Sequence, residues 1–441
     1  MVNRYGDGGR GGYFGLFILF VGGINIKDSY LLLGYGCANR SLACYLKTLG
    51  RQYLIYDDNL ADYRYDIDFN RFTTVVKSGG VPADHWMVMA SRKLGKDIIS
   101  DLELFYRLSP NKTLIAVTGT NGKTTTAALT AHILGDIDLG GNIGTALFDF
   151  IDSPRDIVIE ASSFMLEDCR YFHPQIAVIL NLSPHHLSRH GCFSKYVQAK
   201  MKIIANCKDS DIIIYNDDDP LLCELVKRKP GIIIPFSLKK KVPGCYLARG
   251  KIYFHERALL DIKKIPLIGE HNIANVMAAL ATALSYRPDL VDFERKIESF
   301  RSFAYRIEYL GSRDGINYYN DSKATNYAAL ASSLASFPKE KILLLCGGTQ
   351  EEGNINLIAG VLTNIIQVIA SGDNREAIER FFTEKGIPVV TYQSLAVALD
   401  NLNRYLGNAT VVLLSPGAPS YDQFKDYKER GDFFSKWFLK K

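Results

Sequence analysis

Residues 113–134 read TLIAVTGTNGKTTTAALTAHIL, and this stretch decides the fold. Its apolar start, residues 113–117, predicts a buried strand, and residues 126–134 predict a helix. Between them, Gly119 and Gly122 let backbone N–H groups turn towards phosphate oxygens, while the helix N-terminus adds partial positive charge. A plain turn before a helix is the alternative. The strand and the helix on either side favour a nucleotide-binding phosphate loop.

The loop carries the side chains that a nucleoside triphosphate needs. Lys123 would place a positive charge at the outer phosphates, and Thr124 would offer its hydroxyl to Mg²⁺. The glycine that opens the usual pattern is replaced by Val117, and a glycine stands at position 119 instead. We expect ATP to contact Gly119, Thr120, Asn121, Gly122, Lys123, Thr124 and Thr125.

Three further side chains, Glu160, His186 and Lys200, lie after the phosphate loop in the sequence and are candidates for the same site. Glu160 ends the run IVIE, where a phosphate-loop protein usually places a carboxylate for its metal; without such a loop, an exposed acid would be the simpler interpretation. His186 follows the apolar run 177–180, at the sheet edge where α/β proteins bind ligands, although neighbouring histidines are often only exposed polar residues. Lys200 lies in a helical run, 194–207, where an exposed charge is the default interpretation.

The order of elements predicts a three-domain α/β protein. Short apolar runs alternate with amphipathic stretches from about residue 29 onwards, which is typical of mainly parallel sheets, and 441 residues exceed what one core usually serves. The predicted divisions are an extension over 1–28 and domains over 29–110, 111–304 and 305–441. The predicted strands cover residues 30–33, 53–56, 113–117, 157–160, 177–180, 211–215, 342–345, 365–369 and 411–414.

Composition narrows the class of partner. The net charge of +5 is small for this length and no long Lys/Arg run occurs, so we expect small anionic ligands and no nucleic acid. The eight cysteines form no C-x-x-C pair, which favours scattered reduced thiols in a cytoplasmic protein.

Residues 13–24 are apolar behind two arginines, yet they lack a cleavage site and are too short to span a bilayer. We expect an ill-defined extension, such as an upstream start codon would add, and no membrane partner, with an anchor as the lesser alternative.

Several motifs occur in an order that resembles the Mur ligase family. They are GTNGKTT (119–125), GGNIG (140–144), IEASSF (159–164), the His186 segment, YVQAK (196–200), EHNIAN (270–275), YRIE (305–308) and NDSKATN (320–326). Residues 413–431, LLSPGAPSYDQFKDYKERG, are similar to the branch of the family that adds D-glutamate. The resemblance covers the chain from about residue 29 and is weakest in the first domain.

The resemblance implies a fold and an activity. The fold is a Rossmann-like UDP-binding domain, a central P-loop domain with a mainly parallel sheet, and a Rossmann-like C-terminal domain for the amino acid. The activity is that of a cytoplasmic, monomeric, ADP-forming ligase in peptidoglycan precursor synthesis. It would add D-glutamate to UDP-N-acetylmuramoyl-L-alanine through an acyl phosphate, using ATP and two Mg²⁺ ions or Mn²⁺ in their place.

The resemblance also implies roles for single residues. Lysine carbamylation needs a neutral amine and turns a cation into an anion, which suits a position beside metal ions. The implied metal ligands are Thr124, Glu160, His186 and Lys200 as its carbamate, and the implied catalytic residues are Lys123, Glu160, His186, Lys200 and Lys323. Adenine and ribose would be held by Asn275, Arg306 and Asp321. The UDP substrate and the amino acid would be held by Gly36, Cys37, Ala38, Asp57, Ser78, Asn142, Thr325, Ser420, Tyr421 and Tyr427.

Some positions depart from the family pattern. Glu351 stands where a lysine would grip a carboxylate of D-glutamate, and losing such a pair costs roughly 2–5 kcal/mol. Lys323 or Lys425 could replace that cation, the alignment could be shifted, or the amino acid could differ. Asn39 replaces the third glycine of the first-domain loop, so a plain turn is an alternative there. A folylpolyglutamate-type ligase, another Mur ligase, and a P-loop ATPase or scaffold without ligase activity stay open as alternatives.

Overall fold

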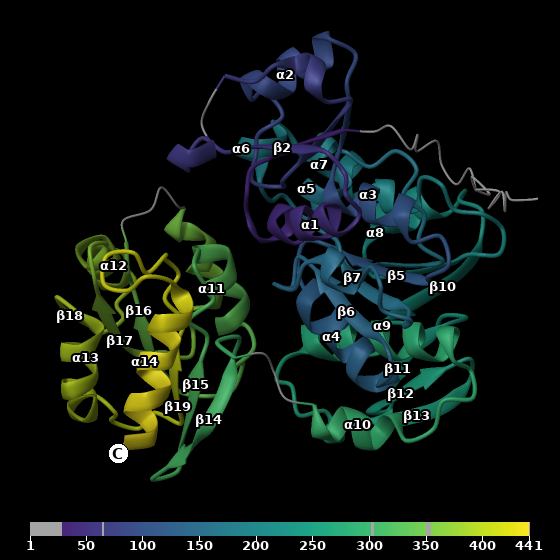
Figure 1. Ribbon diagram of the computed structural model, residues 1–441. Coiled ribbons are helices and arrows are strands. Elements are labelled where there is room, and N and C mark those ends of the chain that lie inside the picture. Colours follow the sequence, from purple (N-terminus) through teal and green to yellow (C-terminus); the bar gives the residue numbers. More distant parts are fainter. Residues whose placement is uncertain (1–28, 64–65, 301–303, 350–353, 441) are drawn as a thin grey trace, which may run out of the picture.

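The computed structural model describes residues 29–63, 66–300, 304–349 and 354–440. Three sheets follow one another along this part of the chain, and helices cover their faces (Figure 1). We call the three resulting bodies the first, central and C-terminal units. The predicted fold class, three consecutive α/β units with mainly parallel sheets, is confirmed. The extension over 1–28 lies outside the described residues.

The first unit has four parallel strands in the order β2-β1-β3-β4. Strand β1 lies between β2 and β3, so the connection after β1 leads to one side of it and the connection after β2 crosses to the other side. Ligands bind at the carboxyl ends of the strands at such a switch point. The strands are β1 (Tyr30–Leu33), β2 (Tyr53–Tyr56), β3 (Thr74–Lys77) and β4 (Asp97–Ile99). The helices are α1 (Cys37–Thr48), α2 (Trp86–Lys93) and α3 (Asp101–Leu108).

The central sheet has the order β13-β12-β11-β10-β9-β8-β5-β7-β6, parallel from β6 to β11, with β12 and β13 added as an antiparallel meander. Its strands are β5 (Leu114–Thr118), β6 (Asp138–Gly141), β7 (Ile157–Glu160), β8 (Ile176–Ile179), β9 (Ile212–Asn216), β10 (Ile232–Ser237), β11 (Cys245–Ala248), β12 (Lys251–Phe254) and β13 (Arg257–Asp261). Its helices are α4 (Lys123–Leu134), α5 (Ser163–Leu166), α6 (Leu187–His190), α7 (Phe193–Met201), α8 (Pro220–Val226), α9 (Glu270–Tyr286) and α10 (Phe293–Ser299).

The C-terminal sheet has the order β14-β15-β19-β16-β17-β18, parallel except for β14. Its strands are β14 (Glu308–Arg313), β15 (Ile316–Asn320), β16 (Ile342–Cys346), β17 (Ile365–Ser371), β18 (Val389–Tyr392) and β19 (Val411–Leu414). Its helices are α11 (Tyr327–Leu334), α12 (Arg375–Glu384), α13 (Leu395–Asn401) and α14 (Tyr427–Lys440). Short 3₁₀ helices of the chain cover Ala61–Tyr63, Phe69–Arg71, Leu147–Phe150, Lys202–Ile204, Ile262–Lys264, Ile355–Val361 and Leu402–Arg404.

Nine strands were predicted, and other strands, some of them buried, were missed. The predicted strands at 30–33, 53–56, 157–160 and 411–414 have the predicted bounds, and the other five differ by one or two residues at their ends. The missed strands include the buried β3, the largely buried β10, the short strands of the meander from β11 to β13, and β6, whose DLGG sequence has little strand propensity. Each sheet falls within one predicted domain range, and the domain boundaries themselves remain a prediction.

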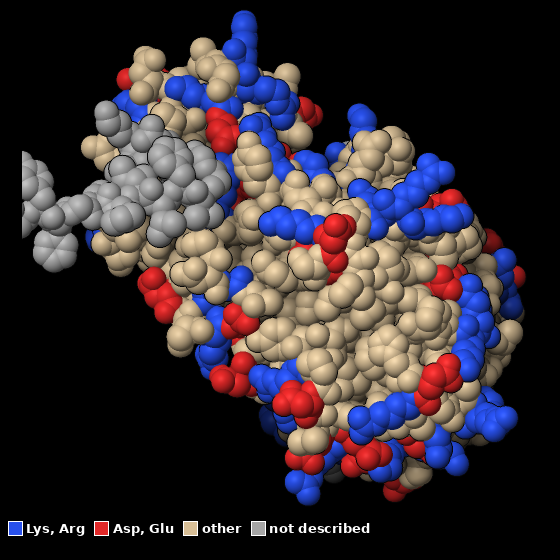
Figure 2. Space-filling model, turned by 90° about the vertical axis from the view of Figure 1, so that its right-hand side faces the viewer, with Lys and Arg blue, Asp and Glu red and all other residues tan. Residues whose placement is uncertain are grey.

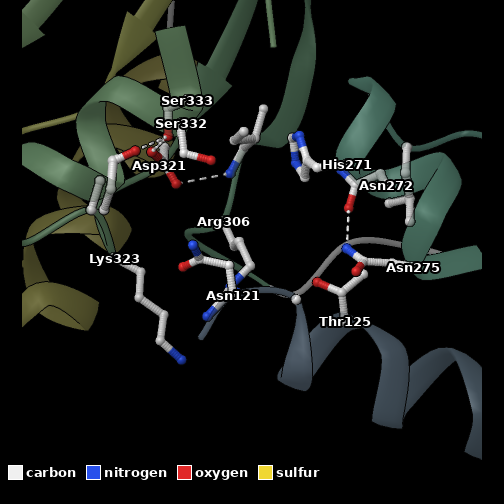
Figure 3. A pocket seen from close by; sticks show the side chains of 15 residues that line it. Asn121, Thr125, His271, Asn272, Asn275, Arg306, Asp321, Lys323, Ser332 and Ser333 are labelled. Atoms are coloured by element: carbon white, nitrogen blue, oxygen red, sulfur yellow. Dashed lines mark hydrogen bonds between the residues drawn. The ribbon is translucent and has the colours of Figure 1, made fainter. Parts of the chain in front are cut away.

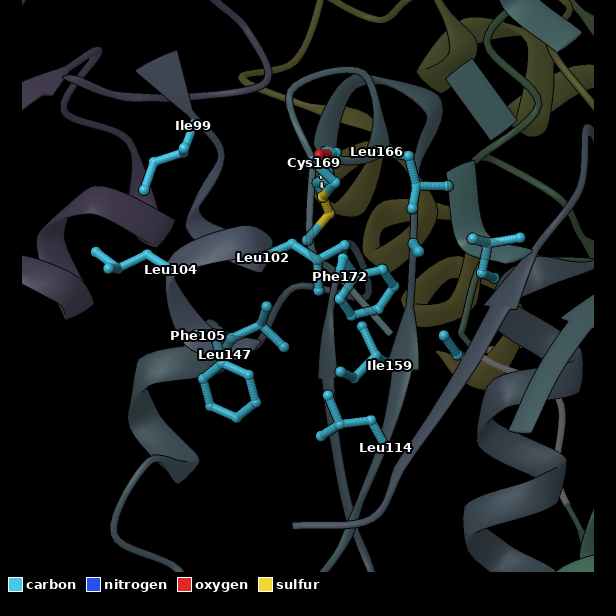
Figure 4. Close-up of a cluster of buried hydrophobic side chains, with 14 of the residues drawn as sticks. Ile99, Leu102, Leu104, Phe105, Leu114, Leu147, Ile159, Leu166, Cys169 and Phe172 are labelled. Atoms are coloured by element: carbon cyan, nitrogen blue, oxygen red, sulfur yellow. Dashed lines mark hydrogen bonds between the residues drawn. The ribbon is translucent and has the colours of Figure 1, made fainter. Parts of the chain in front are cut away.

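The first and central units share one hydrophobic core. Helix α3 places Leu102, Leu104 and Phe105 between the two sheets, where they join Leu114 and Ile159 of the central sheet (Figure 4). By contrast, the C-terminal sheet is enclosed by two clusters whose buried members all lie between residues 316 and 438. The first two units are therefore fixed to each other by apolar burial, whereas the C-terminal unit has a separate core.

Polar contacts complete the junction between the first two units. Glu103 of α3 is fully buried, and its carboxylate accepts hydrogen bonds from the backbone N–H groups of Arg170, Tyr171 and Phe172 at 2.9–3.1 Å. It also accepts one from Arg107 Nε at 2.9 Å.

On the outside, Lys and Arg alternate with Asp and Glu along the lower rim of the face in Figure 2, around an uncharged centre. No helix in the described part of the chain has the length and apolarity of a membrane-spanning segment.

Replacing Glu103 by Gln should weaken this junction strongly. An amide offers one acceptor oxygen where the carboxylate offers two, and it turns an N–H donor towards other donors. We expect E103Q to lose roughly 3–5 kcal/mol of unfolding free energy, the cost of breaking a buried charged network. Urea denaturation measures the loss, with Glu294→Gln, which breaks an exposed contact to Lys264, as the control that leaves the midpoint unchanged. An unchanged midpoint for E103Q would contradict the assignment.

Candidate active site

The phosphate loop lies between the end of β5 and the start of α4. Gly122 is the residue before the helix, and its φ of +85° is one that residues with a side chain rarely adopt. A Cβ at Gly122 would lie 2.3 Å from Oδ1 of Asn275, and one at Gly119 would lie 2.9 Å from Cβ of Leu180. Both glycines are therefore required by close approach as well as by backbone conformation.

Two lysines, the half-buried Lys123 and the buried Lys200, converge on this loop. Lys123 Nζ donates to the carbonyl oxygens of Gly119 at 3.0 Å and Thr120 at 2.8 Å, and Lys200 Nζ donates to Gly119 O at 2.7 Å. Burial, together with Arg306 and Lys323 and against Glu160, lowers the pKa of Lys123 to about 8. Burial, followed by the charge of Lys123, lowers the pKa of Lys200 well below its usual range. The loop thus concentrates positive charge, and a polyanion would relieve the repulsion.

A cavity opens beside the two lysines. Its lining residues are Lys123, Asn142, Ser162, Ser163, Phe164, His185, His186, Tyr196 and Lys200, and we call it the reaction cavity. Glu160 Oε1 accepts a hydrogen bond from Asn142 Nδ2 at 2.8 Å, while the buried Oε2 has no hydrogen-bond partner among the described residues. An orphaned buried carboxylate oxygen beside a phosphate loop fits a divalent cation, for which it is a preferred ligand.

His186 is suited to bind a metal through a neutral ring. It adopts a φ of +52° at the start of α6, and its ring centroid lies 3.8 Å from that of His185 and 4.8 Å from that of Phe164. Burial, followed by His185, Lys123 and Lys200, lowers the pKa of His186 to about 4, so the imidazole keeps a free lone pair at neutral pH.

Protein side chains alone do not complete a metal shell here. In the described part of the chain, no group of three or more His, Cys, Asp or Glu side chains is placed to hold a metal ion. The predicted ligand set contains only two such residues, Glu160 and His186. The remaining ligands would be the Thr124 hydroxyl, a modified Lys200, and oxygens of the bound phosphates.

A second cavity lies between the central and C-terminal units (Figure 3). Asn121 and Thr125 of the phosphate loop and α4, with Asn275 of α9, line it from the central unit. Its full lining is Asn121, Gly122, Thr125, Leu267, His271, Asn272, Asn275, Arg306, Ile307, Asp321, Lys323, Ala324, Ala329, Ser332 and Ser333. The structure therefore brings the three predicted adenine and ribose residues together beside the phosphate loop, and we call this space the adenine cavity.

Asp321 is held rigidly at the edge of the adenine cavity. Its carboxylate accepts hydrogen bonds from Ser333 Oγ, from Ser415 Oγ at 2.8 Å and from the backbone N–H of Ile307 at 3.2 Å. Burial raises the pKa of Asp321 to about 6 in spite of these hydrogen bonds and of Arg306. At neutral pH the group is thus an ionised acceptor, which suits a ribose hydroxyl.

Arg430 of α14 organises the loops beside Asp321. Its buried guanidinium donates to Ser322 Oγ and Ser322 O at 3.0 and 2.9 Å, to Ala418 O at 3.0 Å, to Pro419 O at 3.3 Å and to Gly347 O at 3.5 Å. Burial lowers the pKa of Arg430 to about 10, which still leaves it charged. One side chain therefore connects three loops at the carboxyl ends of β15, β16 and β19.

A third cavity lies at the switch point of the first sheet. It is lined by Leu33, Gly34, Gly36, Tyr56, Asp57, Asp58, Asn59, Ser78, Gly80, Val81, Pro82 and His85, and we call it the nucleotide cavity. Asp57 accepts hydrogen bonds from the backbone N–H groups of Tyr35 at 2.7 Å and Asn59 at 2.8 Å. His85 Nε2 lies 2.7 Å from Asp58 Oδ2.

Comparison with known proteins gives one consistent result. Residues 117–283 match the model of the Mur ligase middle domain. The UDP-N-acetylmuramoylalanine--D-glutamate ligases of Geobacillus sp. (strain WCH70) and Streptococcus pneumoniae (strain CGSP14) are 33% and 31% identical to the chain over 378 and 370 residues. Each alignment covers 82% of this chain and 82% of the relative.

This chain belongs to the Mur ligase family.

Solved structures agree on the fold. The UDP-N-acetylmuramate-alanine ligase of Thermotoga maritima superimposes with a TM-score of 0.61 at 21% identity, covering 94% of this chain and 100% of that chain. The MurF ligase of the same organism, solved in complex with ADP, gives a TM-score of 0.61 at 17% identity, covering 94% and 96%. These likenesses support the three-unit architecture.

Most predicted site residues of this Mur ligase line one of the three cavities. In the first unit, Gly36, Asp57 and Ser78 line the nucleotide cavity, and Cys37 and Ala38 begin α1 just after it. In the C-terminal unit, Ser420 is buried and the ring of Tyr427 lies 5.7 Å from Lys323 Nζ. Thr325 follows Lys323 in the same loop, whereas the side chain of Tyr421 is 73% exposed. Glu351 lies outside the described residues, and the roles of all these residues remain predictions.

The sequence did not reveal several side chains that shape the site. The Tyr196 hydroxyl lies 2.9 Å from Thr120 Oγ1, and Asn181 Oδ1 accepts from Asn121 N at 2.9 Å, so both fix the phosphate loop from neighbouring segments. Arg430 and His271 were also missed. In a single sequence nothing marks Tyr196 or Arg430 as part of the site, because only the fold shows which groups they contact.

Replacing Gly122 by Ala should disrupt nucleotide binding. The new Cβ would meet the Asn275 amide at 2.3 Å in a backbone conformation that costs a residue with a side chain about 1–2 kcal/mol. We expect the affinity for a non-hydrolysable ATP analogue to fall by roughly tenfold or more, measured by calorimetry. Gly360→Ala is the control, because a Cβ there meets no atom within 4 Å. Equal affinities for G122A and the unaltered protein would show that the loop tolerates a side chain.

Proposed function

We propose that this Mur ligase adds D-glutamate to UDP-N-acetylmuramoyl-L-alanine through an acyl phosphate, with release of ADP and phosphate from ATP, in peptidoglycan precursor synthesis. The observation that carries the proposal is the position of the phosphate loop between two cavities. Asn121, Gly122 and Thr125 face the adenine cavity, whereas Lys123 faces the reaction cavity with Lys200 and His186. The relatives above 30% identity are named for this reaction.

The chemistry follows from that placement. A carboxylate oxygen of the L-alanyl group attacks the terminal phosphorus of ATP, the bond to the bridging oxygen breaks, and ADP leaves. The amine of the amino acid then attacks the acyl carbon, loses a proton and expels phosphate, leaving the amide. Lys123, Lys323 and Arg306 supply the positive charge that holds the phosphates in line, and the buried setting strengthens these interactions.

One divalent metal would be held beside the reaction cavity by Glu160 Oε2 and the Thr124 hydroxyl, and a second metal by His186 and the Lys200 carbamate. When bound, Mg²⁺ would offset the repulsion between the attacking carboxylate and the phosphates. The chain's own part is to keep Glu160 oriented through Asn142 and to keep His186 neutral through burial.

Lys200 has the environment that carbamylation requires. Its amine is buried, and burial followed by the charge of Lys123 lowers its pKa well below the usual range, which favours the neutral form that attacks CO₂. The carbamate would replace a cation beside Lys123 with an anion. That change would remove the repulsion that burial of two neighbouring lysines imposes.

The acceptor is proposed to enter at the loops that Arg430 holds. Thr325, Ser420 and Tyr427 lie on or beside these loops, and Lys323 bridges from them to the adenine cavity. We propose that the protein is a cytoplasmic monomer that acts on small-molecule substrates. A P-loop ATPase without ligase activity would leave the nucleotide cavity and Lys200 without a role, and the identities of the relatives argue against it.

Phosphate release by purified protein tests the proposed reaction. The assay contains Mg²⁺, ATP and UDP-N-acetylmuramoyl-L-alanine and compares D-Glu, L-Glu, D-Asp, meso-diaminopimelate and L-Lys as acceptors. We expect release to require both the UDP substrate and D-Glu, with the product confirmed by mass. Release with another acceptor would replace the amino acid, and release without the UDP substrate would overturn the ligase assignment.

Carbamylation of Lys200 can be observed directly. We expect protein equilibrated with ¹³C-bicarbonate to show a carbamate carbon resonance that is absent from Lys200→Met. Lys202→Met, two residues away and hydrogen-bonded to the Glu167 carbonyl, is the matched control and should retain the signal. A signal of equal size in the Lys200 variant would place the carbamate elsewhere.

A further inference from the structure

A buried lysine lies at the junction of the first and central units, outside the three cavities. Lys77 ends β3, and its side chain is 0% exposed. Its Nζ lies 2.9 Å from Glu167 Oε1 and 2.9 Å from Asp168 Oδ2, and it donates to Val81 O at 3.2 Å. Both carboxylates belong to the segment that follows α5 of the central unit, so the ion pairs cross from one unit to the other.

Arg189 of α6 joins the same cluster from the central unit. Its Nη2 donates to Glu167 Oε1 at 2.6 Å and to Val81 O at 2.6 Å. Glu167 and Val81 O are therefore each shared by Lys77 and Arg189. Burial alone would raise the pKa of Glu167, but Lys77 and Arg189 outweigh it and lower the pKa, so the carboxylate stays ionised.

The cluster connects walls of two cavities. On one side, Val81 and the neighbouring Ser78 line the nucleotide cavity. On the other side, α5 begins with Ser163 and Phe164, which line the reaction cavity, and α6 follows directly on His186. The two walls also touch, because a Cβ added at Gly79 would lie 3.2 Å from Cβ of Phe164.

The shared apolar core holds the two units together but does not set their exact relative position, since apolar burial is not directional. Charged hydrogen bonds have preferred distances and angles, so they restrict how the two units can shift relative to each other. Lys77 donates hydrogen bonds to Glu167 Oε1 at 2.9 Å and Val81 O at 3.2 Å and forms an ion pair with Asp168 Oδ2 at 2.9 Å, which allows little sliding of the loop 78–82 over the central unit. Breaking such a cluster leaves charges uncompensated, so the geometry is strongly enforced.

We propose that the Lys77–Glu167–Arg189 cluster is a positioning element that sets the distance between the nucleotide cavity and the reaction cavity. A substrate whose nucleotide end occupies the first cavity would thereby present its reacting carboxylate at the second. The residues of the cluster act through the loop 78–82 and α5, not by touching the reacting atoms. This inference rests on the proposed function, in which one substrate spans both cavities.

The test separates a substrate that spans both cavities from one that fills a single cavity. For Lys77→Met we expect kcat/KM for UDP-N-acetylmuramoyl-L-alanine to fall by roughly 10–100-fold, the effect of misplacing a reacting group by about 1 Å. The affinity for UDP, which occupies only the nucleotide cavity, and the KM for ATP should stay unchanged. Equal losses for UDP and the full substrate would mean that the pocket itself collapsed and would overturn the proposal.

Arg107→Met is the matched control for lost stability. Arg107 is also a buried cation of this junction, but its partners Asp97 and Glu103 line none of the three cavities, whereas Val81, a partner of Lys77, lines the nucleotide cavity. We expect it to lower the melting temperature as K77M does while keeping kcat/KM for the full substrate. The same kinetic loss in both variants, or none in K77M, would overturn the proposal. Failure of the unaltered protein to use the UDP substrate would instead reject the proposed function.

Discussion

The placement of half-buried Lys123 and buried Lys200 beside the acid Glu160 is the constraint on which the rest of the site depends. Two ammonium groups can stay in such a place only if carbonyl oxygens accept their hydrogen bonds, and Gly119 O serves both of them. That carbonyl is available because β5 ends at Thr118 and the loop turns through two glycines before α4 begins. Glu160 reaches the same point because β7 pairs in parallel with β5, with Glu160 opposite Val117.

The units differ in how they are joined, and the difference matches their tasks. The first and central units share a core and buried charged contacts, so the nucleotide cavity and the reaction cavity keep a fixed relation. The C-terminal unit has its own clusters and meets the central unit around the adenine cavity. A nucleotide bound there touches both units and can draw them together, whereas no comparable freedom exists between the first two.

What could be predicted from the sequence depended on whether the signal was local. The phosphate loop, the strand ending in Glu160 and eight other strands of the three sheets depend on neighbours in the chain, and their positions were predicted to within one or two residues, whereas the buried β3 and β10 were missed. The grouping of Asn275, Arg306 and Asp321 around one cavity was predicted through the family resemblance. Lys77 was missed because strand β3 itself was not predicted, and only the packing of the segment after α5 against this strand makes the lysine a buried ion-pair partner. The meander from β11 to β13 was missed because its mixed polarity suits an exposed sheet edge.

Arg430 also imposes an order on assembly. It belongs to the last helix of the chain, yet the loop it holds around Ser322 is made 108 residues earlier, and the loops at Gly347 and Ala418 also precede it. During synthesis the phosphate loop and the nucleotide cavity can fold while the C-terminal unit is still being made. The three loops beside Asp321 cannot settle until α14 has left the ribosome. The loops beside Asp321 are therefore the last part of the site to take their final form.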